Sequence, residues 1–379
     1  MVDIRIDNPV GRVPDTSTMS VWTLRATAAG WQLGRRRRGG WDSSLEELLP
    51  RLDEVHELRV DDAGLPPGPA EALARFLHRA VARGTYVSGT LDPTVLSRLP
   101  GDLARHVVAA TDERAGDLAW DVRSVLQRRA ALRPLFPRWP SLSLVLVSRR
   151  CDLVRPLVER LARVDYPDLQ IVVGLHGCPA PEGLPAAAAG RDLVVREYPA
   201  EQVFGSVLED AWACASGELV SKVDDDDYMS DSHVRDLVMA YGYSGATLVG
   251  KSTTVVYLEA VDTTVRRLFG VRESFTHRVA GSTFLMSPGD LAAVGGWPHV
   301  PRAVDSRLIE AIRRAGGTIY QPHDIGYLYV RGADPSGHTW TTGIDHFLRN
   351  TREQWVGLLR HPEFGTEADP SAGRRAGEG

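Results

Sequence analysis

The chain has 379 residues, 43% of them hydrophobic and 25% charged, which is the composition of a globular protein with one large domain or two ordinary ones. Its 44 basic and 49 acidic residues leave a net charge of −5, which excludes a general electrostatic attraction to nucleic acid. No apolar run approaches the roughly 18 residues that a membrane span needs, and the N-terminus lacks the pattern of a signal peptide. We therefore expect a cytoplasmic protein without a transmembrane segment.

The three cysteines, Cys151, Cys178 and Cys214, indicate whether the protein belongs to an oxidising or a reducing compartment. Their spacing contains no C-x-x-C pair, which argues against a disulfide framework and against a zinc site. Cysteines that are neither paired nor clustered in this way favour a reducing compartment. The sequence therefore predicts no disulfide framework.

Residues 1–140 are predicted to form a separate N-terminal domain that is smaller than the next one and either α/β or mostly helical. The expected strands and helices are Val21–Ala26, Leu45–Leu52 (helical), His56–Val60, Ala70–Arg83 (helical) and Leu118–Leu132 (helical). About the first 14 residues, and a tail over residues 361–379, are rich in proline, glycine and charge and are expected to be disordered. No cluster in this domain indicates a chemistry, so acceptor binding, partner binding and a homodimer are all open.

The basic run Arg35–Arg38 lies in this domain and has two interpretations. The ordinary one is a solvated turn. The other is contact with anionic lipid or with a polyanionic substrate, worth about 1 kcal/mol per basic residue near a charged surface. Peripheral contact with a membrane therefore stays open.

After the proline-rich segment Pro134–Pro140, strands and helices alternate, which predicts an α/β domain over residues 141–360. We expect a mostly parallel mixed sheet flanked by helices. Its first strands are predicted at Leu142–Val147, Leu169–Val173 and Glu218–Val223, and Asp152 and Asp231 are expected to cap helices. In open α/β sheets, ligands bind beyond the carboxyl ends of the strands, so the residues that follow these strands are candidate site residues.

Four consecutive aspartates, Asp224–Asp227, follow the third of these strands. Alternate carboxylates such as Asp224 and Asp226 point to the same side of an extended or turning chain and can converge on one hard cation. Mg²⁺ and Mn²⁺ accept one or two protein carboxylates and fill their remaining positions with phosphate and water. The run therefore suggests a metal site that also holds a diphosphate, and its alternative is a solvated acidic loop.

The segment from about Ser141 to Arg349, slightly over half of the chain, resembles the family 2 glycosyltransferases with the GT-A fold. GELVSKVDDDDYMS resembles the family's acidic (DXD) motif, VAGSTFLMSPGDLAAVGGWP its acceptor-side segment, and VPRAVDSRLIEAIRRAGGTIYQ its E-D-x-x-L helix. Two strand ends depart from the family pattern: Val147–Arg150 stands where Pro-Thr-x-Asn is usual, and His176–Cys178 where an aspartate pair is usual. These departures leave the base and the sugar of the donor open.

The resemblance implies a metal-dependent, inverting transferase of hexosyl type that uses a nucleotide-diphosphate sugar donor. The acceptor would be a hydroxyl of a glycan, a lipid-linked sugar or a small metabolite. The residues expected to hold Mn²⁺ or Mg²⁺ are Asp226, Asp224 and His338, and those expected to contact the donor are Asp224, Asp225, Asp227, His176, Arg149 and Arg331. The candidate general base is Asp305, which is also a candidate N-cap of a helix over Ser306–Ala315.

Two alternatives compete with this interpretation. The segment Gly245–Ser252, GATLVGKS, matches the phosphate-binding loop of nucleotide hydrolases letter by letter. That loop must follow a strand and open a helix, whereas here a helical pattern precedes it and a strand pattern over Thr247–Leu258 overlaps it, so we interpret the match as chance. The second alternative is a non-catalytic relative that binds nucleotide sugars, which an assay for donor hydrolysis would distinguish.

Overall fold

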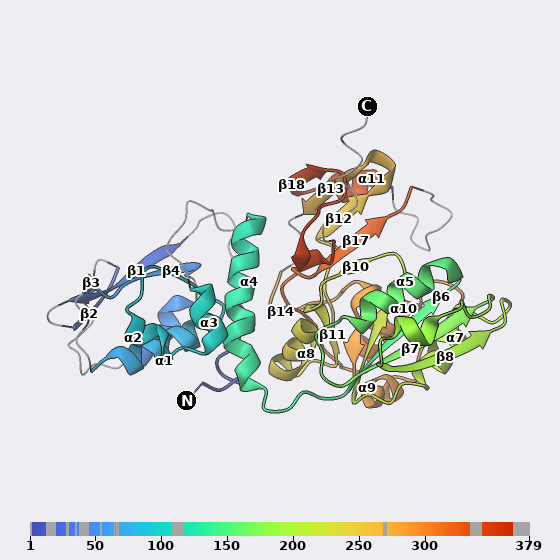
Figure 1. Cartoon of the computed structure of the whole chain (residues 1–379), viewed down its shortest axis with the longest axis horizontal. Helices are drawn as coiled ribbons and strands as arrows, with labels where there is room; N and C mark the ends of the chain where they lie inside the picture. The colour runs from blue at the N-terminus through green and yellow to red at the C-terminus, as the bar shows by residue number, and fades with distance from the viewer. Residues whose placement is uncertain are drawn as a thin grey trace. The chain divides into compact units, whose positions relative to one another are not determined.

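The structure of the chain is a computed structural model (Figure 1). It describes residues 2–12, 20–27, 30–34, 36–37, 45–53, 55–63, 65, 68–107, 117–267, 271–333 and 343–366. The chain divides into two compact units. The first comprises Met1–Pro137 with the short segments Gly242–Ser244 and Arg272–Ser274, and the second comprises the remaining residues.

The first unit is built on a five-stranded sheet with the strand order β3-β2-β1-β4-β5. Its strands are β1 (Val21–Thr27), β2 (Gly30–Leu33), β3 (Arg36–Arg37), β4 (Glu57–Asp61) and β5 (Tyr86–Ser88). β1, β4 and β5 run parallel, whereas β2 pairs antiparallel with β1 and β3. Its helices are η1 (Leu45–Leu52), α1 (Ala70–Ala82), α2 (Pro93–Leu96), α3 (Gly101–His106), α4 (Leu118–Leu132) and η2 (Arg133–Leu135). Of the two forms left open for this region, the structure shows the α/β one.

Helix α1 shows how the apolar pattern of the sequence builds this unit. Leu73, Phe76, Leu77 and Ala80 recur at helical spacing on one face, and all four side chains are fully buried. Burial of a leucine or phenylalanine stabilises a fold by about 1.5–3 kcal/mol relative to exposure. The stripe is therefore sufficient to hold α1 in the unit, and the helix predicted over these residues is confirmed.

The two chain ends correct the expectation of disorder where they are described. Residues 2–12 form turns, and Asp7 is fully buried with its carboxylate accepting hydrogen bonds from Arg79 Nε at 2.9 and 3.0 Å. A buried carboxylate requires such a partner, so this ion pair holds the N-terminal segment in place. Near the other end, η6 (Pro362–Phe364) buries Phe364 completely, and residues 367–379 lie outside the described residues.

The second unit is built on an eight-stranded mixed sheet with the order β14-β16-β11-β15-β9-β6-β7-β8 (Figure 1). Its strands are β6 (Leu142–Ser148), β7 (Leu169–His176), β8 (Asp192–Tyr198), β9 (Leu219–Val223), β11 (Leu248–Val249), β14 (Ser274–Phe275), β15 (Leu285–Met286) and β16 (Ile319–Gln321). β9, β6, β7 and β8 run parallel to one another, and β15 is antiparallel to both of its neighbours. The predicted α/β class with a mostly parallel mixed sheet is confirmed.

Helices flank this sheet, as predicted. They are α5 (Cys151–Ala162), α6 (Leu184–Ala187), α7 (Phe204–Trp212), α8 (His233–Ser244), α9 (Pro288–Ala293) and α10 (Val304–Arg314). α11 (Ile344–Leu348) instead packs its Phe347 against the second, smaller sheet of this unit. Side chains of α7 and α10, including Leu208 and Leu308, pack with Val145 of β6 and Val172 of β7 in one buried cluster. Within the described ranges, no helix combines the length and the apolar character that a membrane span requires.

A smaller five-stranded sheet, with the order β10-β17-β12-β13-β18, completes the second unit. Its strands are β10 (Tyr228–Met229), β12 (Val255–Leu258), β13 (Thr263–Arg267), β17 (Tyr327–Arg331) and β18 (Thr351–Val356). The four aspartates connect β9 of the large sheet directly to β10 of the small one. The acidic run therefore lies at the junction of the two sheets, which places it at the centre of this unit rather than on a loop tip.

Three aspartates expected or considered as helix caps are not caps. Asp152 is the second residue of α5, whose cap is Arg150, and Asp231 precedes the cap Ser232 of α8. Asp305 is the second residue of α10, which follows Ala303 in a left-handed conformation with a φ of 59°. A helix start is decided by the backbone conformation of the residue before it: Ser232 is a preferred N-cap residue, whereas Arg150 and Ala303 are not.

A disulfide joins Cys151 and Cys178. The prediction that the cysteines form no disulfide framework is therefore wrong for these two, whereas Cys214 is free. The bond connects the first residue of α5 to the turn after β7, because the adjacent parallel strands β6 and β7 end at the same edge of the sheet. A local spacing rule such as C-x-x-C does not detect a pair that the sheet brings together.

Candidate functional site

Three neighbouring parallel strands end at one edge of the large sheet and carry the candidate residues there. Leu146 of β6 lies opposite both Val173 of β7 and Val223 of β9, so the residues that follow these strands converge. Arg149 and Arg150 follow β6, His176 ends β7, and the four aspartates follow β9. The structure thus brings together most of the residues that the sequence assigned to the site.

Asp225 holds the turn after β6 rather than facing open space. Its carboxylate accepts hydrogen bonds from Ser148 Oγ and from Arg150, with Arg150 Nε 3.1 Å from Oδ2. Its side chain is 10% exposed, and both of its oxygens are engaged within the protein. The sequence predicts a donor contact for Asp225, whereas this geometry gives it a supporting position.

Asp224 and Asp226 each use one carboxylate oxygen for a basic side chain and keep the other. Asp224 Oδ1 lies 2.6 Å from Lys222 Nζ, and Asp226 Oδ2 lies 2.9 Å from Arg150 Nη2. Within the described part of the chain, no hydrogen bond reaches Asp224 Oδ2 or Asp226 Oδ1. Burial and the neighbouring charge of Asp224 raise the pKa of Asp226, although Arg150 opposes this shift.

This pair of carboxylates fits a divalent cation that binds together with a phosphate. Among the described residues, no group of three or more His, Cys, Asp or Glu side chains is arranged to hold a metal by itself. Mg²⁺ and Mn²⁺ in phosphate sites need just one or two protein carboxylates, and the free oxygens of Asp224 and Asp226 meet that requirement. His338, the expected third contact, lies outside the described residues.

Lys222 connects the acidic run to the candidate base. Its side chain is 4% exposed, and its Nζ lies 2.6 Å from Asp224 Oδ1 and 3.5 Å from Asp305 Oδ1. Burial by itself would lower the pKa of Lys222, but the charges of Asp224 and Asp305 outweigh it and raise that pKa. Lys222 is therefore a permanent cation that holds both carboxylates at the same place.

Asp305 keeps a third of its side chain exposed and faces this edge from α10. Burial raises the pKa of the Asp305 carboxyl, while the nearby Lys222 lowers it in part. Gly281 packs so closely on the carboxylate that a methyl group at this position would overlap it. The absence of a side chain at Gly281 is thus what allows Asp305 to stand where it does.

Asp227, the last aspartate of the run, is part of the interior. It is 2% exposed, and its oxygens accept hydrogen bonds from Tyr327 Oη at 2.7 Å and from the Val330 amide at 3.0 Å. Burial and the charge of Asp226 raise the pKa of Asp227 to about 8. The sequence predicts a donor contact here as well, but the side chain instead fastens the acidic run to β17.

Arg149 and His176 form a second group at the same edge. Arg149 Nε and Nη2 each lie 3.1 Å from a ring nitrogen of His176, and Nη2 also donates to the Ala200 carbonyl at 3.2 Å. The His176 ring is buried and stacks on Phe204 with the ring centres 6.4 Å apart. Arg331, at the end of β17, is 7% exposed with its guanidinium 5.9 Å from the centre of the Phe347 ring.

The phosphate-loop alternative is contradicted by the position of Lys251. Gly245 ends α8, and β11 follows, so the segment does not open a helix. Lys251 and Asp236 are both fully buried and form an ion pair of 3.0 Å, and Lys251 also donates to the Ile325 carbonyl. A lysine in this position cannot reach the phosphates of a nucleotide.

Two residues of the site, Lys222 and Arg150, were not assigned to it from the sequence. One signal for Lys222 was present: Lys222 and Lys251 are the chain's two lysines, among 44 lysines and arginines. A chain that uses arginine almost everywhere else places lysine at two buried positions, where a compact ammonium fits and a guanidinium fork does not. Arg150 carried no such signal, because its partners are set by the register of β6 and β9.

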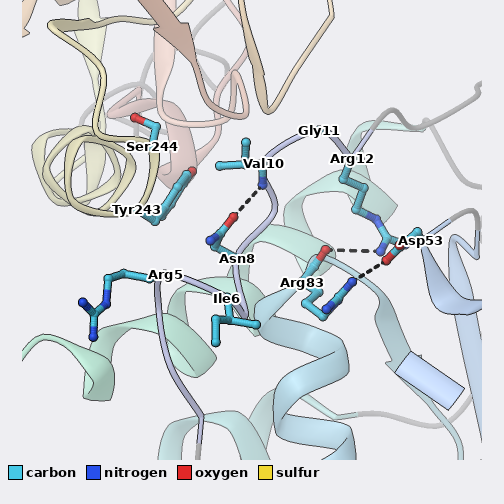
Figure 2. A pocket seen from close by; sticks show the side chains of 10 residues that line it. All are labelled: Arg5, Ile6, Asn8, Val10, Gly11, Arg12, Asp53, Arg83, Tyr243 and Ser244. Carbon is cyan, nitrogen blue, oxygen red and sulfur yellow. Dashed lines mark hydrogen bonds and ion pairs between the residues drawn. The ribbon is translucent and has the colours of Figure 1, made fainter. Parts of the chain in front are cut away.

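A pocket in the first unit was weighed as another candidate (Figure 2). All ten of its lining residues belong to that unit: Arg5, Ile6, Asn8, Val10, Gly11, Arg12, Asp53, Arg83, Tyr243 and Ser244. Figure 2 shows that two of its three basic side chains are engaged with other lining residues: Arg83 binds Asp53 at 2.8 Å, and Arg12 donates to the Arg83 carbonyl at 3.2 Å. The third, Arg5, is 83% exposed and lies 3.5 Å from Asp3.

No family model matches the chain, and no curated protein matches it by sequence. Among solved structures it is similar to the mannosyltransferase PcManGT from Pyrobaculum calidifontis in complex with GDP-Man and Mn²⁺, with 17% identity over 52% of this chain and 57% of that one, at a TM-score of 0.40. It is also similar to S. aureus TarS 1–349, with 14% identity over 50% of this chain and 60% of that one (TM-score 0.38). TarS 1–349 in complex with UDP-GlcNAc gives 15% identity over 51% and 59% (TM-score 0.39). The chain spans about 57–60% of these structures, and similarities of this size leave the function to be argued from the residues of the site.

Proposed function

We propose that the second unit is a metal-dependent, inverting glycosyltransferase of hexosyl type. It moves a sugar from a nucleotide-diphosphate donor to a hydroxyl of a glycan, a lipid-linked sugar or a small metabolite. The observation that carries the proposal is the position of Lys222, whose Nζ contacts both Asp224 and Asp305. One side chain thereby joins the carboxylates suited to a metal and diphosphate to the carboxylate suited to accept a proton.

The donor is held at the edge where β6, β7 and β9 end. Asp224 and Asp226, with His338 as a third contact, would hold Mn²⁺ or Mg²⁺. Such a cation would supply electrostatic stabilisation for the negative charge that the diphosphate gains as it leaves the sugar. Arg149 and His176 take the nucleoside, and Arg331 takes the diphosphate.

Asp305 acts as the general base on the acceptor side. Its side chain is one third exposed although Oδ1 itself is buried, and burial gives the carboxyl a raised pKa, which favours its taking a proton from the acceptor hydroxyl. Attack by that oxygen on the face of the sugar opposite to the diphosphate is a single displacement, which inverts the anomeric configuration. Asp225 and Asp227 support the site by holding Arg150 and Tyr327.

Titration calorimetry with a panel of nucleoside diphosphates, with and without Mn²⁺, tests this proposal. We expect binding that needs the metal, prefers one base and is lost in Asp226→Asn. Asp231→Asn, which removes an exposed carboxylate just beyond the run, is the matched control and should bind like wild type. Binding that ignores both the metal and the Asp226 substitution would contradict the proposal.

Turnover then separates a transferase from a protein that just binds nucleotide sugars. With the donor identified, wild type should transfer or hydrolyse the sugar, and Asp305→Asn should keep donor binding while losing about 100-fold or more in kcat. Metal-dependent binding without turnover by wild type, with any acceptor tested, would support the non-catalytic alternative instead.

A further inference from the structure

Arg150 is held at the candidate metal site by two contacts of its own and by a disulfide at the next residue. Its backbone amide donates to Ser148 Oγ at 2.9 Å, and the next residue, Cys151, is fixed by the disulfide to Cys178. Its guanidinium grips Asp225 through Nε and Nη2. The backbone and the base of this side chain are therefore fixed before any ligand binds.

The same guanidinium also contacts Asp226, one of the proposed metal ligands. Arg150 Nη2 lies 2.9 Å from Asp226 Oδ2, so one arginine spans two neighbouring aspartates. The Arg150 side chain is 42% exposed and the Asp226 side chain 24%, so this end of the pair reaches solvent. The contact with Asp225, whose side chain is 10% exposed, is the inner anchor, and the contact with Asp226 is the outer one.

We propose that Arg150 is a built-in cation of this site and competes with the divalent metal for Asp226. The inference rests on the proposed function, because it takes Asp226 as a metal ligand. Two cations at one carboxylate repel each other, and this repulsion is weakly screened in a partly buried site. Metal binding must therefore weaken or break the contact between Arg150 and Asp226, while Asp225 keeps the arginine close by.

The competition has a consequence for the order of binding. Without a nucleotide, the metal meets a carboxylate that is already neutralised, so it binds weakly. A diphosphate brings oxygens that the metal needs, and it offers the released guanidinium a planar, two-point anionic partner. Metal and diphosphate should therefore bind together, each raising the affinity for the other by the same factor.

Binding of Mn²⁺ alone to the nucleotide-free protein tests the competition directly. The free Mn²⁺ signal in electron paramagnetic resonance gives the dissociation constant without any turnover. At low ionic strength, Arg150→Gln should bind Mn²⁺ about tenfold more tightly than wild type, because a positive charge in contact with the ligand is removed. Arg150→Lys, which keeps the charge but cannot span both aspartates, should fall between the two.

Two variants serve as controls. Arg149→Gln removes the same charge one residue earlier, but from a side chain that contacts His176 and the Ala200 carbonyl rather than the aspartates. It should change the Mn²⁺ affinity by about twofold at most, since its charge acts from farther away and is better screened. Asp226→Asn should abolish the tight binding.

The outcomes separate this inference from the function on which it rests. If wild type binds Mn²⁺ through Asp226 and Arg150→Gln binds it equally well or less well, the competition is overturned and the metal site stands. If neither protein binds Mn²⁺, the competition is overturned, and calorimetry with nucleoside diphosphates and Mn²⁺ decides separately whether the metal site stands. Thermal melting of each variant confirms that it is folded, and Arg150→Lys decides the question if Arg150→Gln does not fold.

Discussion

The surroundings of Lys222 and of Lys251 show two different uses of a buried lysine in the same unit. Both ammonium groups are inaccessible and both pair with aspartate. Lys251 and its partner Asp236 are each 0% exposed, whereas the partners of Lys222, Asp224 and Asp305, keep 38% and 33% of their side chains exposed. One lysine closes a charge pair inside the fold, and the other presents two carboxylates to solvent.

The difference shows that a match to a sequence motif does not by itself identify a functional site. The motif GATLVGKS predicts a phosphate-binding role for Lys251, but the Lys251 ammonium is paired with the buried Asp236 and therefore contributes to stability alone. Lys222 belongs to no phosphate-loop pattern, yet its position makes it the cation of the candidate site. Accessibility of the partner, rather than burial of the lysine, separates the two environments.

The largest effect we expect comes from breaking the interior pair. Lys251→Met breaks the buried ion pair and leaves Asp236 with His323 Nε2, 3.5 Å away, as a basic neighbour, and breaking a buried pair typically destabilises a protein by about 3–5 kcal/mol. Urea denaturation followed by circular dichroism should show this loss in the unfolding of the second unit. The folded fraction should still bind nucleoside diphosphates, because the Lys251 ammonium contacts Asp236 and the Ile325 carbonyl rather than any of the four aspartates of the run.

The double variant Lys251→Met with Asp236→Leu is the control for this prediction. Replacing both charges by apolar groups removes the buried carboxylate, so much of the lost stability should return. A Lys251→Met protein that keeps its stability and loses binding of nucleoside triphosphates would reverse the comparison and restore the phosphate loop.

The disulfide between Cys151 and Cys178 should stabilise the edge of the sheet that carries the candidate site. Cys151 and Cys178 are 27 residues apart, and a loop of that length corresponds to about 3.5 kcal/mol of stabilisation through the unfolded chain. Cys151→Ser should lower the melting temperature by several degrees, and a dithiol reductant should lower that of wild type to the same value. Cys214→Ser, at the free cysteine, is the matched control and should melt like wild type. An unchanged melting temperature in Cys151→Ser would contradict this role.

Substitution of Lys222 should lower turnover more than stability, whereas substitution of Lys251 should lower stability alone. Lys222→Met leaves two carboxylates that water can still reach, so the fold should lose far less than in Lys251→Met. Without the shared cation, Asp224 and Asp305 move apart, and a displacement of about 1 Å lowers a rate about 100-fold. Steady-state kinetics should therefore show the loss mainly in kcat, with the KM for the donor changed less.

Lys222→Arg distinguishes positioning from simple charge. The longer guanidinium does not fit the enclosed space of a compact ammonium, so the charge alone should not restore turnover. Full activity in Lys222→Arg, or a loss in Lys222→Met that follows the unfolded fraction, would remove Lys222 from the site.

The sequence predicted those parts of the fold that depend on local pattern. The apolar run after Pro140 is a strand whose seven residues are all buried, and the periodic segment Leu118–Leu132 is a helix with those limits. The smaller sheet was not foreseen, because it pairs β10 with β17 and β13 with β18 across roughly 90–100 residues. Pairings of this kind depend on the whole chain and leave no periodic signal in either strand.

The sequence likewise predicted one part of the candidate site and not the other. The position of Asp224–Asp227 at a strand end follows from the alternation of strands and helices, and the structure places the run there. Which aspartates remain accessible did not follow, since Asp227 is buried by Tyr327 and Asp225 is gripped by Arg150, from elements about 75–100 residues away. Charge partners at a sheet edge are set by the register of neighbouring strands, which the sequence of one strand does not contain.

The smallest effect we expect concerns pH and the second group at the site edge. Burial lowers the pKa of His176, and the charge of Arg149 lowers it further, so the folded protein holds this ring neutral. The unfolded chain takes up the proton first as the pH falls below 6.5, so this contribution to stability is complete above that pH and is lost below it. His176→Gln removes the titrating group, and the difference in unfolding free energy between the two proteins should therefore shrink from pH 7.5 to pH 5.5. A difference that stays constant over this range would mean that His176 is not held neutral by Arg149 and the buried edge.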